Sequence, residues 1–209
     1  MLKRLMVDPR LPDPEALRSA ANTLAHGLIV AFPTETFYGL AVDPRNPEAV
    51  RRLYRAKQRG NAAIALIAAD LPQIERQVGR LSPTMRHLAA RFWPGPLTLI
   101  IEAWPSLAEQ IHGGLSTVGV RVPNHPVARQ LAREVDYPVT ATSANLSGGD
   151  AAATAGEVAA SLGDAVALIL DAGPAPGGMP STVVDVQGER PVLVRGGAVA
   201  WARVLESLV

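Results

Sequence analysis

Short apolar runs with the length of strands alternate along this chain with segments that have helical spacing. The expected strands occupy residues 28–32, 97–102, 118–122, 138–142, 165–171, 182–186 and 191–195, and residues 64–69 form another apolar run. The expected helices occupy residues 14–26, 46–55, 82–91, 125–134, 154–162 and 201–208. Because strands and helices interleave and some strands are adjacent, we expect an α/β fold with a mixed sheet covered by helices.

Composition limits the chain to a few classes of protein. With 209 residues, of which 48% are hydrophobic and 19% charged, it is long enough for one filled core, so we expect one domain over residues 1–209. The net charge of +1 gives no global basic field, so any RNA contact must be local. The absence of cysteine excludes disulfides, thiolate metal sites and thiol catalysis.

The sequence carries no targeting or membrane signal. Lys3 and Arg4 near the N-terminus are not followed by an apolar run of signal-peptide length. No stretch approaches the roughly 18 apolar residues of a membrane span. We therefore expect a cytoplasmic protein without membrane contact.

Familiar catalytic signatures are missing. There is no Gly-x-x-x-x-Gly-Lys-Ser/Thr loop, no Gly-x-Gly-x-x-Gly after a strand and no Gly-x-Ser-x-Gly elbow. The histidines at positions 26, 87, 112 and 125 stand singly, without the spacing of zinc ligands, so we expect no bound metal.

Two distant segments each place a pair of polar groups two residues apart. These are Lys57-Gln58-Arg59, after a helix, and Ser143-Ala144-Asn145, after a strand. Residues i and i+2 share a face only in an extended segment, so we expect the chain to be extended at both. Two cations opposite two hydrogen-bonding groups would suit a polyanion such as a nucleotide.

The loop 33–40 directly follows the strand 28–32, where open α/β sheets place ligands. In an extended chain Thr34 and Thr36 face one way and Glu35 the other. A turn with hydroxyls bonded to the backbone is the alternative interpretation. We favour that turn for Thr36, and a ligand for Thr34.

Two arginines raise a question that the sequence leaves open. Arg121 lies in the apolar segment 120–123, where burial is costly unless an anion or acceptor pairs with the guanidinium. Its partner is either an internal carboxylate or a ligand, and Arg195 poses the same question. The Pro/Gly-rich segment 173–180 is either a lid or a plain connection.

Six motifs occur in an order that resembles one known family. They are Pro33 to Leu40, Lys57-Gln58-Arg59, Arg91 to Thr98, Val120 to Pro123, Thr142 to Gly148 and Pro180 to Asp185. Over about residues 12–197 the chain closely resembles the YrdC-like threonylcarbamoyl-AMP synthases, in their short single-domain bacterial form. The resemblance implies a mixed, twisted sheet of about seven strands with a concave basic cavity, flanked by helices.

The resemblance also implies a reaction. L-threonine, bicarbonate and ATP would give threonylcarbamoyl-AMP and pyrophosphate, and a downstream tRNA threonylcarbamoyl transferase complex would use the product. Positioning and cations do most of the work in such chemistry. Mg²⁺ would arrive with ATP, without a tightly bound cofactor, because no acidic cluster is visible.

The resemblance assigns roles to individual residues. Lys57 and Arg59 would be catalytic and bind the triphosphate and carboxylate charge, and Ser143 and Asn145 would hold the nucleotide. The remaining assignments are Arg121 and Arg195 at the nucleotide end, and Thr34, Tyr38 and Ser181 at the threonine. The chain departs from common family patterns at Gly60, where many relatives have proline, at Phe37, and in the segment 64–69, which has no histidine.

Two other functions compete with this one. The first is a non-catalytic paralogue that binds double-stranded RNA or tRNA, although a net charge of +1 argues against strong RNA affinity. The second is carbamoyl transfer in hydrogenase maturation, where a similar module normally belongs to a longer chain with cysteine-rich zinc elements. The absence of cysteine argues against it.

Overall fold

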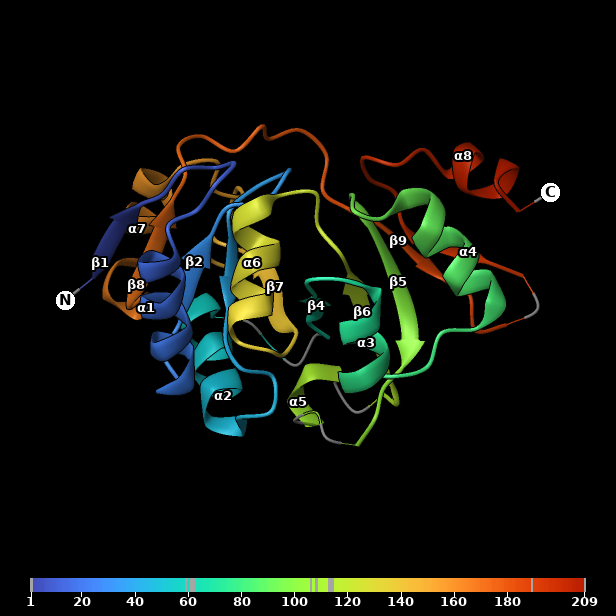
Figure 1. Cartoon of the computed structure of the whole chain (residues 1–209), viewed down its shortest axis with the longest axis horizontal. Coiled ribbons are helices and arrows are strands. Elements are labelled where there is room, and N and C mark those ends of the chain that lie inside the picture. Colours follow the sequence, from blue (N-terminus) through green and yellow to red (C-terminus); the bar gives the residue numbers. More distant parts are fainter. Residues whose placement is uncertain are drawn as a thin grey trace.

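The computed structural model describes residues 2–58, 60, 63–105, 107, 109–112, 115–188 and 190–208 (Figure 1). Ten strands in this part of the chain form one mixed, twisted sheet in the order β1-β8-β2-β3-β7-β4-β6-β5-β9-β10. The strands are β1 (Lys3–Met6), β2 (Val30–Phe32), β3 (Gly39–Ala41), β4 (Ala65–Ile67), β5 (Leu97–Glu102), β6 (Thr117–Arg121), β7 (Val139–Ser143), β8 (Leu168–Asp171), β9 (Thr182–Asp185) and β10 (Val192–Arg195).

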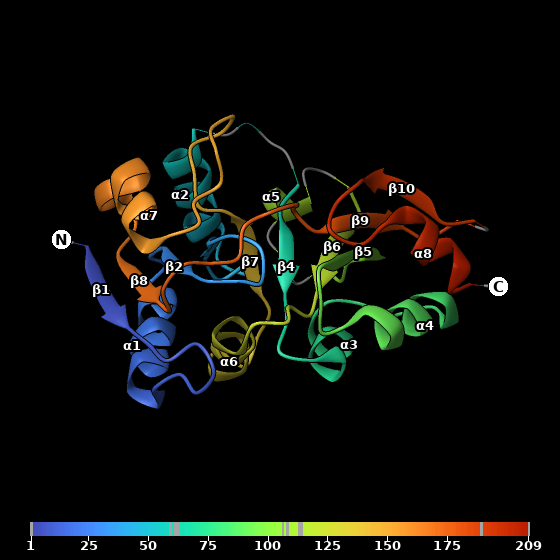
Figure 2. The same cartoon turned by 90° about the horizontal axis from the view of Figure 1, so that it is seen from above.

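Helices cover both sides of this sheet. They are α1 (Pro14–Ala25), α2 (Pro47–Lys57), α3 (Leu71–Gln77), α4 (Pro83–Phe92), α5 (Glu109–His112), α6 (Pro126–Glu134), α7 (Ala155–Leu162) and α8 (Trp201–Glu206), with a 3₁₀ turn at Gly163–Ala165. In Figure 2, α1, α6, α3 and α4 follow one side of the sheet, and α2, α5 and α7 lie on the other. The mixed α/β fold is therefore confirmed.

The sheet has more strands than the seven or so expected. One of the additional strands, β4, lies in the apolar run 64–69. No apolar run indicated β1 and β3, which pair with β8 and with β2 and β7. Most of β1 is exposed at the sheet edge, so it lacks an apolar run, and β3 has three residues, beginning with Gly39. Strands this short are stabilised by pairing with distant segments, which a local pattern does not reveal.

Helix starts follow the capping signals in the sequence. The side chain of Asp13 accepts a hydrogen bond from the backbone of Glu15 before α1, and Thr154 forms a reciprocal capping box with Glu157 before α7. These bonds satisfy backbone donors that have no partner within the helix. Some boundaries were wrong: α2 continues to Lys57, two residues beyond the expected end, α8 ends at Glu206, and β8 begins at Leu168 instead of residue 165.

The segment 173–180 connects β8 to β9 across the sheet. The backbone of Ala175 donates to Ala153 O at 2.7 Å, and that of Gly177 donates to Thr36 O at 2.7 Å. The segment is thus tied to the loop that follows β2. No helix in the described ranges has the length and apolar character needed to span a bilayer.

Candidate functional site

A cavity of about 540 Å³ forms where segments far apart in the sequence meet. The loop after β2, the strands β4, β5, β6 and β7, the end of the 173–180 segment and β10 all contribute to its wall. Six residues singled out from the sequence line it: Thr34, Tyr38, Arg121, Ser143, Ser181 and Arg195. The structure therefore brings together residues that are up to 161 positions apart (195 − 34 = 161).

The hydroxyls of Thr34 and Thr36, in the loop after β2, are hydrogen-bonded to one another. Thr34 Oγ1 lies 3.1 Å from Thr36 Oγ1, donates to Phe37 O at 2.7 Å and accepts from the backbone of Thr36 at 3.2 Å. The turn that we expected for Thr36 thus includes the Thr34 hydroxyl as well. Thr34 and Thr36 nevertheless both line the cavity.

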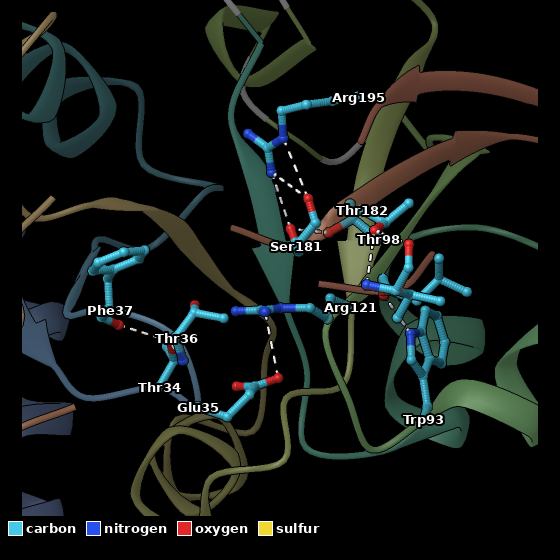
Figure 3. Close-up of polar contacts among 12 residues, drawn as sticks. Thr34, Glu35, Thr36, Phe37, Trp93, Thr98, Arg121, Ser181, Thr182 and Arg195 are labelled. Atoms are coloured by element: carbon cyan, nitrogen blue, oxygen red, sulfur yellow. Dashed lines mark hydrogen bonds and ion pairs between the residues drawn. The ribbon is translucent and has the colours of Figure 1, made fainter. Parts of the chain in front are cut away.

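Arg121 has an internal carboxylate partner, which answers one question that the sequence left open. Its Nη1 lies 3.4 Å from Glu35 Oε1, and the two side chains are only 8% and 15% exposed. Burial lowers the pKa of the Arg121 guanidinium, and the charge of Glu35 opposes that shift. In Figure 3 the guanidinium points from β6 toward Thr34 and Thr36, with Glu35 to one side of it.

Arg195 occupies another part of the wall and is held by Ser181. Its Nε and Nη2 donate to Ser181 O at 3.3 and 2.8 Å, and Nη2 also donates to Ser181 Oγ at 3.1 Å. Thr98 Oγ1 lies 2.9 Å from Ser181 Oγ. Figure 3 shows this group and Arg121 as separate cationic sites within one region.

Thr98 was not singled out from the sequence. It lies in the apolar strand β5, between the buried residues Leu97 and Leu99, and lines the cavity. Since successive side chains of a strand point to opposite faces, a polar residue at an alternate position could have indicated a polar wall.

Lys57 contacts both Ser143 and Asn145 at the end of β7. Lys57 is buried, and its ammonium donates to the backbone oxygen of Ser143, to Asn145 O at 2.8 Å and to Asn145 Oδ1 at 3.3 Å. The backbone of Ser147 donates to Lys57 O at 2.9 Å. These contacts join the end of α2 to the turn after β7.

The extended geometry expected for the two polar pairs is wrong. Lys57 ends a helix, and Gln58 follows it in the left-handed conformation, with φ 50°. After Ser143 the chain turns at once, since the backbone of Asn145 donates to Ser143 O at 3.0 Å. The long side chain of Lys57 reaches these carbonyl oxygens from a helix end, so no extended segment is needed. Arg59 lies outside the described residues.

Tyr38 lines the cavity but directs its hydroxyl elsewhere. The phenol donates to Gly173 O at 2.7 Å and lies 3.3 Å from Asp171 Oδ1, and the backbone of Ala172 donates to it at 3.3 Å. Burial raises the pKa of the Tyr38 phenol, and the Asp171 charge adds to the shift. The hydroxyl therefore anchors the beginning of the 173–180 segment.

The described residues do not gather into a metal site. Across these ranges no group of three or more histidine, cysteine, aspartate or glutamate side chains is placed to hold a metal ion. The expectation that Mg²⁺ enters with a nucleotide stays a prediction.

Comparison with known proteins places these features in one family. The Sua5, YciO and YrdC family model, described as "Telomere recombination", matches residues 22–197. Threonylcarbamoyl-AMP synthase of Bacillus subtilis is 41% identical over 92% of this chain, and that of Pyrococcus abyssi is 38% identical over 87%. The chain spans 56% and 54% of the length of these two relatives. A putative threonylcarbamoyl-AMP synthase of Mycobacterium tuberculosis is 37% identical, over 94% of this chain and 92% of its own length.

Solved structures show the same fold. P. abyssi Sua5 complexed with L-threonine superposes with a TM-score of 0.92 and 33% identity, over 100% of this chain and 61% of its own. Escherichia coli YciO superposes with a TM-score of 0.86 and 25% identity, over 96% of this chain and 98% of its own.

Proposed function

This chain belongs to the Sua5/YciO/YrdC family, and we propose that it is an L-threonylcarbamoyladenylate synthase, which makes threonylcarbamoyl-AMP and pyrophosphate from L-threonine, bicarbonate and ATP. The product would serve a tRNA threonylcarbamoyl transferase complex. The observation that carries the proposal is the shared cavity in which Arg121 and Arg195 lie among threonine and serine hydroxyls. The names of its relatives, and a family structure that contains L-threonine, support the choice of substrate.

The reaction needs two bond-forming steps in one enclosed place. The amine of threonine attacks the carbon of bicarbonate, so that a carbamate forms and water leaves. A carbamate oxygen then attacks the α-phosphorus of ATP, the bond between the α- and β-phosphates breaks, and pyrophosphate leaves. Negative charge accumulates on phosphate oxygens, so fixed cations and hydrogen-bond donors supply most of the catalysis.

Arg121 is best suited to the amino-acid end of the cavity. The resemblance alone assigned it to the nucleotide, but its guanidinium points toward Thr34 and Thr36 (Figure 3). A guanidinium pairs with a carboxylate through two parallel hydrogen bonds, and neighbouring hydroxyls suit an amino acid that itself carries a hydroxyl. We therefore assign the carboxylate of threonine to Arg121.

Arg195 and Ser181 are suited to the phosphate end. Arg195 is exposed at the end of β10, and its hydrogen bonds to Ser181 fix the direction of its guanidinium. Its charge would attract the triphosphate and oppose the charge that develops on pyrophosphate. A Mg²⁺ ion bound to the phosphates would enter with ATP, as it does in many phosphoryl-transfer sites.

Lys57 would act on the nucleotide mainly through Ser143 and Asn145. Its ammonium already bonds three oxygen atoms of these two residues, so its first effect is to fix the turn after β7. Ser143 borders the cavity at this turn. Arg59, two residues further along the chain, keeps the role of triphosphate ligand that the resemblance implies.

Pyrophosphate release tests the proposal directly. The complete mixture of ATP, Mg²⁺, L-threonine and bicarbonate should release pyrophosphate, and omission of either threonine or bicarbonate should reduce release to background. Mass spectrometry should detect threonylcarbamoyl-AMP in the complete mixture only. If the purified chain makes no product but binds RNA with a steep salt dependence, the non-catalytic RNA-binding alternative is correct instead.

A further inference from the structure

Glu35 lies beside the cavity wall and points away from its two neighbours. It sits between Thr34 and Thr36 in the loop after β2, yet unlike them it is not a lining residue of the cavity. Figure 3 shows its carboxylate next to the Arg121 guanidinium, on the side of α6. Glu35 thus approaches the cavity only through Arg121.

Glu35 and His125 each have a buried polar atom without a hydrogen-bond partner among the described residues. Glu35 Oε1 pairs with Arg121 Nη1 at 3.4 Å, while Glu35 Oε2 is buried without a hydrogen-bond partner among the described residues. Nδ1 of His125, just before α6, is buried without a partner in the same part of the structure. Buried polar atoms without partners are costly, so the internal hydrogen bonds of this group only partly offset the cost of its burial.

His125 does not compete with Arg121 for the negative charge of Glu35. Burial lowers the pKa of the His125 imidazole, and the charge of Glu35 only partly opposes that shift. The imidazole is therefore neutral near pH 7 and adds no second cation beside Glu35. Glu35 is the charged residue that acts on both His125 and Arg121.

The contact with Glu35 holds the Arg121 side chain in one orientation. A long arginine side chain loses rotamer entropy when it is fixed in one orientation. The 3.4 Å contact uses one of its five N–H donors. The remaining donors can meet an anion in the cavity only if the guanidinium keeps the direction that Figure 3 shows.

We propose that Glu35 is a positioning residue, which acts through Arg121 and holds its guanidinium in the orientation that receives an anionic group in the cavity. The proposal rests on the proposed function only for the identity of that group, the carboxylate of L-threonine. Glu35 has no contact with the reacting atoms and takes no proton.

Positioning and simple charge effects predict opposite results. If Glu35 acted only by its negative charge, its removal would strengthen anion binding at Arg121. If it positions the guanidinium, the loss of its hydrogen-bond acceptor weakens binding. Glu35→Gln removes the charge but keeps an acceptor of the same length, whereas Glu35→Ala removes both.

The test compares these variants by calorimetric titration with L-threonine and by thermal unfolding. We expect Glu35→Ala to raise the Kd for threonine at least about tenfold, because the cavity loses a fixed guanidinium. Glu35→Gln should stay within about threefold of the unmodified protein, since one hydrogen bond to Arg121 survives. Glu48→Gln is the matched control, because Glu48 pairs with Arg51 on the exposed face of α2. The positioning role is overturned if the Gln and Ala variants both bind threonine as tightly as the unmodified protein or more tightly.

A second measurement separates failure of this proposal from failure of the proposed function. Side-chain ¹⁵N spectra report the order of the Arg121 guanidinium without any ligand, and Arg121→Lys identifies its signal. The signal should be sharp in the unmodified protein and in Glu35→Gln, and broadened in Glu35→Ala. If the unmodified protein binds no threonine, the proposed function fails. If the signal is equally sharp in Glu35→Ala, the positioning role fails.

Discussion

Replacement of Gly197 by alanine should disturb the cavity through the backbone alone. A Cβ atom at this position would lie 2.2 Å from Pro180 O, 2.5 Å from Ser181 C and 2.6 Å from Thr182 N. Ordinary contacts of a Cβ begin near 3.4 Å, so the two segments must separate by about 1 Å. All three neighbours are backbone atoms, which cannot rotate aside as a side chain can.

The separation has a structural and a functional effect. Overpacking of this kind costs roughly 1–3 kcal/mol, and loss of the 2.8 Å bond from Ala198 N to Pro180 O adds about 1 kcal/mol. The melting temperature should then fall by roughly 4–16 °C for a chain of this size. Because Ser181 holds Arg195, a shift of about 1 Å should also lower kcat/KM for ATP by up to about 100-fold.

Gly196 provides the matched control, because a Cβ there would meet nothing within 4 Å. Gly196→Ala should change the free energy of unfolding by less than about 0.5 kcal/mol and leave pyrophosphate release unchanged. Calorimetry and the pyrophosphate assay would be run on both variants. If Gly197→Ala matches Gly196→Ala in melting temperature and in kcat/KM, the close packing of these segments does not support the site.

Three further substitutions test other contacts. Lys57→Met should lower the free energy of unfolding in urea by about 3–5 kcal/mol, because buried oxygens lose a charged donor; an unchanged value would contradict that role. The folded-state pKa of His125 lies below its ordinary value, so stability should fall as the pH drops through about 6.5, and urea titrations of His125→Gln should show a shallower fall. Identical slopes would show that His125 is not buried as a neutral group. Tyr38→Phe should cost about 1–2 kcal/mol in thermal unfolding and leave the KM for threonine within about twofold, because its hydroxyl bonds Gly173 O; a large rise in KM would show that this hydroxyl meets the substrate.

Local sequence signals predicted much of this fold. Apolar runs identified strands such as β5 and β6, and capping residues such as Asp13 identified helix starts, because both depend on near neighbours. The strands β1 and β3 depend on pairing with segments more than 100 residues away, namely β8 and β7. No periodic pattern in so few residues could reveal that pairing.

The site shows the same division between local and distant contacts. The sequence indicated that Arg121 needs a partner, but only the fold identifies Glu35, 86 positions away, as that partner. The sequence grouped Lys57 with Asn145 correctly, although it predicted extended chain where the structure has a helix end and a turn. Spacing alone did not show that a lysine at a helix terminus can reach across to a strand end.

A crystal structure of the protein with L-threonine and a non-hydrolysable ATP analogue would test the central claim most directly. We predict that both ligands lie in the one cavity, with the threonine carboxylate hydrogen-bonded to Arg121 and the phosphates next to Arg195. Binding of either ligand on another face of the molecule, or threonine in the cavity without contact to Arg121, would contradict the account.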